Sequence, residues 1–309
     1  MEFVRSLRAE HWILLAGLIL LGYWLLRTSL GVKALADSMP RRNSMPPYLP
    51  LIPLFIWFGP VPMVVIVVRQ AFAQTSPIGQ TGLTGEGYAA FLDNCIFIGG
   101  GIVTTLVILF LARAHFARRL KGFGLNVKAA PADFLGAIAN LLAVWPLVLA
   151  AIAVTMFVGR YIWGQDYQMQ KHQELQLLAE YPQLPLRIAV VVAAAVIAPV
   201  LEELLFRGLV QTLARSLLEA RTGTRANSDI HRQVSAGPWS RSRRSVWLAI
   251  AVSSALFALM HANREHWPAL FILGVGLGYS YEKSGSLFRP IFMHAFFNSA
   301  MIAVAVSQP

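Results

Sequence analysis

The sequence contains few charged residues and almost no cysteine, and each shortage excludes a class of protein. Charged side chains make up 13% and hydrophobic ones 56% of the 309 residues. Soluble domains typically carry about a quarter charged residues, so the chain is too apolar for that class. Cys95 is the single cysteine, which excludes an intrachain disulfide and a metal site built from several cysteines. A metal ligand set would have to come from His, Glu and Asp.

Several functional patterns are also absent from the sequence. No serine or cysteine nucleophile motif is present, and the spacing His-Glu-x-x-His of many zinc proteases does not occur. No internal repeat is visible, which gives little support to a transporter built from duplicated halves.

Long apolar runs occupy most of the chain and predict a membrane protein. A helix needs about 20 predominantly apolar residues to cross the hydrocarbon core. Eight runs approach or exceed this length, at residues 12–26, 51–68, 95–112, 134–158, 186–215, 246–261, 267–281 and 287–306. The sequence thus predicts an all-α, polytopic membrane helix bundle with about eight transmembrane segments.

Four of these runs carry further expectations. Prolines at positions 53, 60 and 62 predict a kink or a late start in the second run. The fifth run would be about 45 Å long as one helix, which exceeds the hydrocarbon core of about 30 Å. It must tilt, protrude or break near Pro199. The sixth and seventh runs are short and predict a shallow hairpin whose tip, residues 262–266, stays within or near the membrane.

The basic residues are distributed unevenly between the two sides of this map. Alternate loops collect 18 Lys and Arg on one side and 7 on the other, in a chain of net charge +11. This bias places the basic side at the cytoplasm, facing anionic lipid. The most basic stretch, residues 215–244, is expected to be a loop near lipid or solvent rather than a nucleic-acid site. We expect a multi-pass integral membrane protein, of the plasma (inner) membrane in a bacterium, without a nucleic-acid partner.

Residues 199–208 read Pro-Val-Leu-Glu-Glu-Leu-Leu-Phe-Arg-Gly and place three ionisable groups in the interior of the fifth run. Such groups are costly in a bilayer and mark function by default. In an α-helix, residues four apart share a face, so Glu203 can pair with Arg207 while Glu202 points elsewhere. One arginine cannot fully compensate two buried acids, which weakens a purely structural interpretation.

Two later runs supply polar partners for these acids. The sixth run ends with Phe257-Ala-Leu-Met-His261, and the eighth contains His294-Ala-Phe-Phe-Asn298. His294 and Asn298 are four apart and share a helical face, in an apolar setting where each polar side chain needs a partner. A lone histidine is more often structural, but two intramembrane histidines with an asparagine and two glutamates favour chemistry.

Together these motifs resemble the CPBP family, also called Abi, which contains the CAAX prenyl endopeptidases and bacteriocin-processing intramembrane proteases. The resemblance covers about residues 186–306. It divides the chain into N-terminal transmembrane helices and loops at residues 1–185, as an accessory part, and a CPBP-like catalytic core at 186–309. The motif residues are Glu202, Glu203, Arg207, Phe257, His261, His294 and Asn298.

The resemblance implies an intramembrane endopeptidase that hydrolyses peptide bonds of membrane-associated substrates. The substrate would be a peptide or lipidated protein, with a prenylated CAAX protein as one alternative and bacterial peptide processing as another. Glu202 would be the base that activates water, and His261 would hold the same water. Glu203 would be oriented by Arg207.

The same resemblance leaves the metal requirement open. In a metal-independent glutamate protease, His294 and Asn298 would stabilise the tetrahedral oxyanion. In a metalloprotease, His261 and His294 would join Glu202 around a zinc ion.

Two functions outside proteolysis also remain open at this stage. A proton-coupled transporter would use Glu202, Glu203 and His261 as a proton relay, would not need Asn298 and would cleave no peptide. A non-catalytic membrane scaffold would tolerate substitution of all these polar residues.

Overall fold

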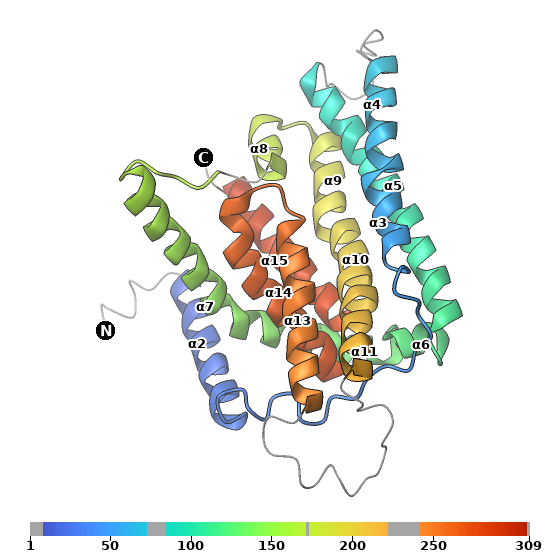
Figure 1. Ribbon diagram of the computed structural model, residues 1–309. Helices are drawn as coiled ribbons and strands as arrows, with labels where there is room; N and C mark the ends of the chain where they lie inside the picture. The colour runs from blue at the N-terminus through green and yellow to red at the C-terminus, as the bar shows by residue number, and fades with distance from the viewer. Residues whose placement is uncertain (1–8, 73–84, 171–172, 222–240, 308–309) are drawn as a thin grey trace, which may run out of the picture. The chain divides into compact units, whose positions relative to one another are not determined.

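The computed structural model describes residues 9–72, 85–170, 173–221 and 241–307 (Figure 1). The structure is 81% helical, and the described residues contain no strand. Within these described ranges, six helical spans are long and apolar enough to cross a membrane. These findings confirm the all-α, polytopic fold.

The first half of the described chain is built from long helices and short connecting turns. It comprises α2 (Ala9–Arg27), α3 (Leu51–Phe58), α4 (Pro60–Phe72), α5 (Glu86–His115), α6 (Arg119–Phe123), η1 (Val127–Ala129), α7 (Ala130–Trp163) and α8 (Gln173–Glu180). The prolines of the second run have the predicted effect, since α3 ends before Gly59 and α4 restarts at Pro60, where a missing amide N–H costs no helical bond.

The second half contains one long helix that changes register and three further helices. It comprises α9 (Leu184–Val192), η2 (Ala193–Ile197), α10 (Ala198–Glu202), η3 (Glu203–Gln211), α11 (Thr212–Arg221), α13 (Arg241–Leu259), η4 (Arg264–His266), α14 (Trp267–Ser284) and α15 (Phe288–Ser307). The elements η2 and η3 are π-helical. The helix therefore does not break at Pro199 but has a π-helical segment on each side of α10.

Each of the eight predicted runs forms helix, with differences at the ends. The six membrane-length spans do not include α13 and α14, the pair predicted to form a short hairpin. The helices of the second and third runs are longer than predicted, because α4 continues to Phe72, beyond 51–68, and α5 already begins at Glu86, before 95–112. The loop expected at 215–244 is wrong at both ends, where α11 and α13 continue; residues 222–240 lie outside the described part of the chain.

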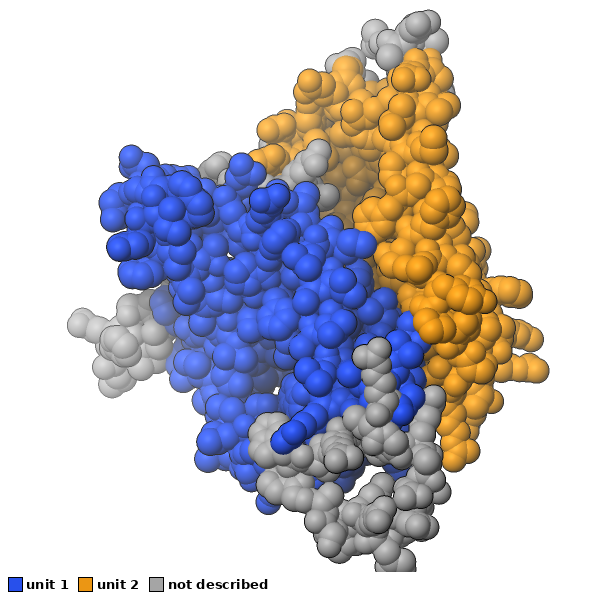
Figure 2. Space-filling view, viewed as in Figure 1, with its two compact units in different colours: residues 1–41, 124–170, 206–293 blue, residues 42–123, 171–205, 294–309 orange. Residues whose placement is uncertain are grey.

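The chain forms two compact units, and both combine segments from the two halves of the sequence (Figure 2). Unit 1 contains Met1–Arg41, Gly124–Gln170 and Phe206–Met293, and unit 2 contains Arg42–Phe123, Lys171–Leu205 and His294–Pro309. The division at residue 185 into an accessory part and a catalytic core therefore stays a prediction.

Unit 1 packs around the small residues of α14. A Cβ atom at Gly274 would lie 2.9 Å from Ser254 of α13, and one at Gly276 would lie 2.7 Å from Val144 of α7. Close approach of helices through small residues is a typical way for membrane helices to associate. A polar contact adds to it where Asn140 Nδ2 donates to Ser280 Oγ at 2.9 Å.

A buried ion-pair network joins the N-terminal linker to α11 and α14 within unit 1. Arg215 contacts Glu282 at 2.6 Å and Glu219 at 2.9 Å. It also donates to the side chain and the carbonyl of Ser38, at 2.8 and 2.9 Å. All three charged side chains are buried. A buried charge must be paired in this way to be tolerated, so the network fixes the linker to the end of these helices.

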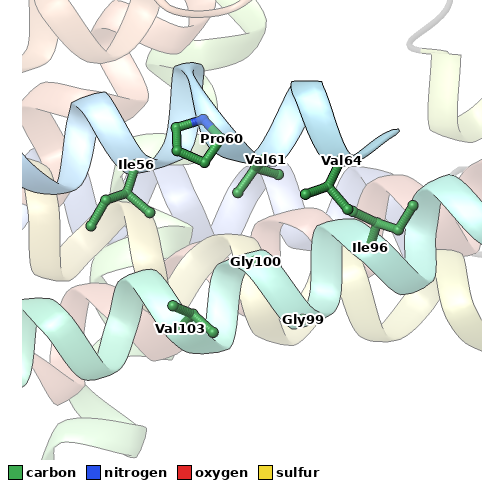
Figure 3. A pocket seen from close by; sticks show the side chains of 8 residues that line it. All are labelled: Ile56, Pro60, Val61, Val64, Ile96, Gly99, Gly100 and Val103. Atoms are coloured by element: carbon green, nitrogen blue, oxygen red, sulfur yellow. The ribbon is translucent and has the colours of Figure 1, made fainter. Parts of the chain in front are cut away.

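Unit 2 packs around α5, which carries three consecutive glycines. A Cβ at Gly100 would lie 2.6 Å from Val61, and one at Gly101 would lie 2.4 Å from Ile197 of η2, whereas Gly99 faces open space. An apolar groove of about 360 Å³ runs between the α3–α4 segment and α5 (Figure 3). It is lined by Ile56, Pro60, Val61, Val64, Ile96, Gly99, Gly100 and Val103. Cys95 is also exposed on α5.

Candidate active site

The two glutamates occupy the point where the long helix of unit 2 changes register. Glu202 ends α10, and Glu203 begins the π-helical η3. Short π-helical segments are rare and occur frequently at functional sites. Glu203 is fully buried, and the Glu202 side chain is 25% exposed although its Oε2 atom is buried. The two glutamates thus lie where the helix changes from α-helical to π-helical register, within a span that is long and apolar enough to cross a membrane.

His294 of α15 contacts both glutamates within unit 2. Its Nδ1 lies 2.9 Å from Glu203 Oε1, and its Nε2 lies 3.9 Å from Glu202 Oε2. With Glu203 ionised, the Nδ1–H group donates to the carboxylate, and the lone pair of Nε2 then faces Glu202. Glu203 therefore sets the tautomer and the orientation of the imidazole.

The resulting geometry places two hydrogen-bond acceptors opposite each other. Glu202 Oε2 accepts no hydrogen bond from any described residue. The 3.9 Å between Oε2 and Nε2 is too long for a direct hydrogen bond, and a single water molecule can donate to both atoms across it. A carboxylate and an imidazole that share one water can act together as a general base.

Asn298 lies one turn beyond His294 on α15 and is held by the backbone of unit 2. Its Nδ2 atom donates to the carbonyl of Ala194 in η2 at 2.7 Å. One of its two amide N–H groups is thus used by the helix that carries the glutamates. The oxyanion contact that the family resemblance implies for this amide stays a prediction.

Arg207 belongs to unit 1, where α13 and α14 hold it. Its guanidinium carbon lies 4.6 Å from the ring centroid of Phe257, and Nη2 donates to the carbonyl of Gly274 at 3.2 Å. The side chain is fully buried. A desolvated cation over an aromatic face is worth about 2 kcal/mol. Sequence reasoning quoted Phe257 as a motif residue but assigned it no role.

His261 follows the end of α13 in the same unit, and Phe257 orients it as well. Because a carbonyl oxygen can only accept, Nδ1–H of His261 donates to the Phe257 carbonyl, at 2.8 Å. In the neutral ring, Nε2 is therefore the atom of His261 that can accept a hydrogen bond from water. Trp267 Nε1 donates to the His261 carbonyl at 2.9 Å, which fixes the predicted hairpin tip.

The structure thus brings the predicted residues together as two groups. Glu202, Glu203, His294 and Asn298 lie in unit 2, and Arg207 and His261 lie in unit 1. Pairing of Glu203 with Arg207 stays a prediction. Its basis needs correction, because the α-helical spacing assumed for these residues is replaced by the π-helical register of η3. The bond between Glu203 and His294 joins residues 91 apart and leaves no trace in local spacing.

The predicted zinc ligands do not form a metal site as they stand. No group of three His, Cys, Asp or Glu side chains among the described residues could hold a metal ion. Zinc in tetrahedral geometry, with bonds of about 2.0–2.1 Å, needs donor atoms about 3.4 Å apart, which is shorter than the 3.9 Å between His294 and Glu202. We therefore derive no step through a metal ion.

Fold and site together define a multi-pass membrane protein with a buried carboxylate–imidazole group. Residues 184–300 match the family model described as "Type II CAAX prenyl endopeptidase Rce1-like". The match spans all six predicted site residues and agrees with the family that the motifs resemble. Comparisons with curated proteins and with solved structures find no match. The family and the helical spans support a CAAX-type protease of the membrane.

Proposed function

We propose that the protein is an intramembrane endopeptidase that hydrolyses membrane-associated substrates with a water activated by Glu202. The proposal is carried by one observation, the opposed acceptors Glu202 Oε2 and His294 Nε2 at 3.9 Å, with His294 oriented by Glu203 at 2.9 Å. The same arrangement of an acid, an imidazole and a reacting oxygen recurs in hydrolases of unrelated fold.

The reaction follows from these positions. Glu202 accepts one hydrogen of the water while His294 Nε2 holds the other, so the oxygen lone pairs point at the substrate carbonyl. Glu202 takes the proton as the oxygen bonds to the carbonyl carbon. The resulting carboxylic acid then gives that proton to the leaving amine nitrogen as the C–N bond breaks. Hydroxide ends on the acyl carbon, the proton ends on the amine, and Glu202 is again ionised.

The remaining site residues support these reaction steps. The water-holding role that the motif implies for His261, a residue of unit 1, stays a prediction. Asn298 retains one amide N–H beyond the one used by Ala194.

The substrates that fit this proposal are peptides or lipidated proteins in the bilayer, with prenylated CAAX proteins as the class named by the family. A membrane-embedded site favours a substrate whose scissile bond is anchored at the membrane, because anchoring raises its local concentration. We place the protein in the plasma (inner) membrane if the cell is bacterial.

The test uses purified protein reconstituted into liposomes with prenylated and unprenylated membrane-tethered peptides. Wild type should cleave, and E202Q and H294A should lower the rate about 10²–10⁴-fold, the range for general-base catalysis. E180Q, at an exposed position of α8, is the matched control and should cleave normally. A chelator should leave the rate unchanged; loss of activity that zinc restores would instead support the metal-dependent form.

Two results would contradict the proposal. Unchanged cleavage by E202Q would remove this carboxylate from the mechanism. Proton movement coupled to a solute, with no peptide cleaved by wild type, would support the transporter.

A further inference from the structure

Asn298 makes its hydrogen bond to an unusual partner, the backbone of another helix. Its Nδ2 donates to the Ala194 carbonyl at 2.7 Å. In a regular helix such a carbonyl is occupied by an amide N–H of its own helix. The bond therefore indicates that the ladder around Ala194 is incomplete.

Pro199 explains why this carbonyl needs a donor. In η2 the ladder runs in π-register, and the N–H of Ala198 donates to Ala193, five residues back. The next donor in this register would be the N–H of residue 199, with Ala194 as its acceptor. Residue 199 is proline, which has no N–H. Asn298 supplies the missing donor from α15.

The site of this repair lies next to the acid pair. Glu202 and Glu203 follow Pro199 by three and four residues, on the same helix. Two bonds therefore join this helix to α15, one from Ala194 to Asn298 and one from Glu203 to His294. A single hydrogen bond would leave the helix free to rotate about that bond. Two hydrogen bonds nine residues apart on the helix also fix its rotation.

We propose that Asn298 is a positioning residue, which replaces the amide missing at Pro199 and thereby holds Glu202 at its distance from His294. This role differs from the oxyanion contact that the family resemblance implies. The cleavage assay that tests this role rests on the proposed endopeptidase function. The test therefore also measures hydrogen exchange, which does not depend on that function.

The two roles respond differently to restoration of the backbone donor. The variant N298L removes the amide, P199A restores an N–H at residue 199, and P199A/N298L combines both. If Asn298 positions the helix, N298L should lower kcat about 10- to 100-fold with KM nearly unchanged, and P199A/N298L should recover to within a few-fold of wild type. If Asn298 stabilises an oxyanion, P199A cannot restore its lost donor.

A matched control separates this local repair from a general effect of removing proline. Pro146 lies inside α7 and has no link to Asn298. The variant P146A/N298L should therefore remain as impaired as N298L. Recovery of activity in this control would overturn the inference.

Hydrogen exchange followed by mass spectrometry tests the same inference without enzymatic activity. N298L should increase deuterium uptake in residues 184–211, and P199A/N298L should return uptake to the wild-type level. This result would support the positioning role even if wild type cleaves no peptide, which would contradict only the proposed function. Unchanged deuterium uptake in N298L would overturn the positioning role. If wild type cleaves peptide, a P199A/N298L variant that recovers wild-type uptake but not cleavage would also overturn it. Should N298L fail to fold, recovery of folded protein by P199A supports the inference, and failure to recover contradicts it.

Discussion

At the scale of single residues, the bond between His294 and Glu203 decides which imidazole nitrogen can act as a base. With Glu203 ionised, the carboxylate accepts from Nδ1–H at 2.9 Å, and the lone pair of a neutral imidazole is then on Nε2, toward Glu202. Both Glu203 and His294 are buried, so no water competes strongly for this contact. The protonation pattern of the site is thus set by one side chain that does not itself need to touch the substrate.

The variant E203Q should disturb this pattern while keeping the size of the side chain. Its amide can donate to Nδ1, which favours the tautomer with hydrogen on Nε2 and removes the acceptor that faces the water. We expect cleavage to fall by about 10²-fold or more, by analogy with the about 10⁴-fold loss when the orienting acid of a catalytic triad becomes an amide. Initial rates and the ¹⁵N shifts of the His294 ring would measure both effects. An unchanged tautomer would contradict the assignment.

Motif spacing identified the six candidate residues, because each motif lies within one helix or at its end. It could not identify the contact between Glu203 and His294, which depends on how two helices pack. It also assumed an α-helical register after Glu202, whereas η3 is π-helical. Pro199 was the available signal, since a proline inside a helix leaves a carbonyl that needs another donor. Asn298, a polar residue in an apolar run, was a candidate to supply that donor.

At the scale of elements, α14 contacts η3 through a ladder of two side-chain bonds. Arg207 donates to the carbonyl of Gly274 and Gln211 donates to that of Gly278, each at 3.2 Å. The two donors are four residues apart, and so are the two acceptors. Glycine at position 278 lets Gln211 approach, because a Cβ there would lie 2.6 Å from Gln211 Oε1.

The variant G278A should therefore lower stability. The added methyl group must displace the fully buried Gln211, and overpacking of this kind costs about 1–3 kcal/mol. G99A is the control, because a Cβ at Gly99 of α5 meets nothing within 4 Å, and alanine is favoured over glycine in a helix by about 0.5–1 kcal/mol. Thermal unfolding in detergent should show a lower Tm for G278A only. Equal Tm values for both variants would contradict the close contact.

At the scale of the whole molecule, the N-terminal linker contacts segments that the charge count placed on the same side of the membrane. Within unit 1, Ser38 and Arg41 reach α11 and α14, where Arg41 lies 3.6 Å above the Tyr281 ring. Within unit 2, the Arg42 carbonyl accepts from the N–H of Ala117, just after α5. Both contacts agree with the predicted alternation of loops. The distribution of Lys and Arg could predict this side but not the partners, since linkers carry no periodic signal.

The variant R215M tests how much the linker contact contributes to stability. It leaves Glu219 and Glu282 buried without their shared cation, and breaking a buried pair costs about 3–5 kcal/mol. R69M is the matched control, because the Arg69–Asp93 pair of unit 2 is largely exposed and worth about 0–1 kcal/mol. Denaturant unfolding in detergent would measure both. R215M should also show faster proteolysis of the linker. Unchanged proteolysis would contradict the inference that Arg215 holds the linker.

The shortage of cysteine has a practical consequence. The one thiol of the chain, Cys95, is exposed on α5, a helix long and apolar enough to span the bilayer. A spin label or fluorophore can therefore be attached at a single known position of the span in the native sequence. The protein offers spectroscopists an attachment point within a lipid-spanning helix before any residue has been changed.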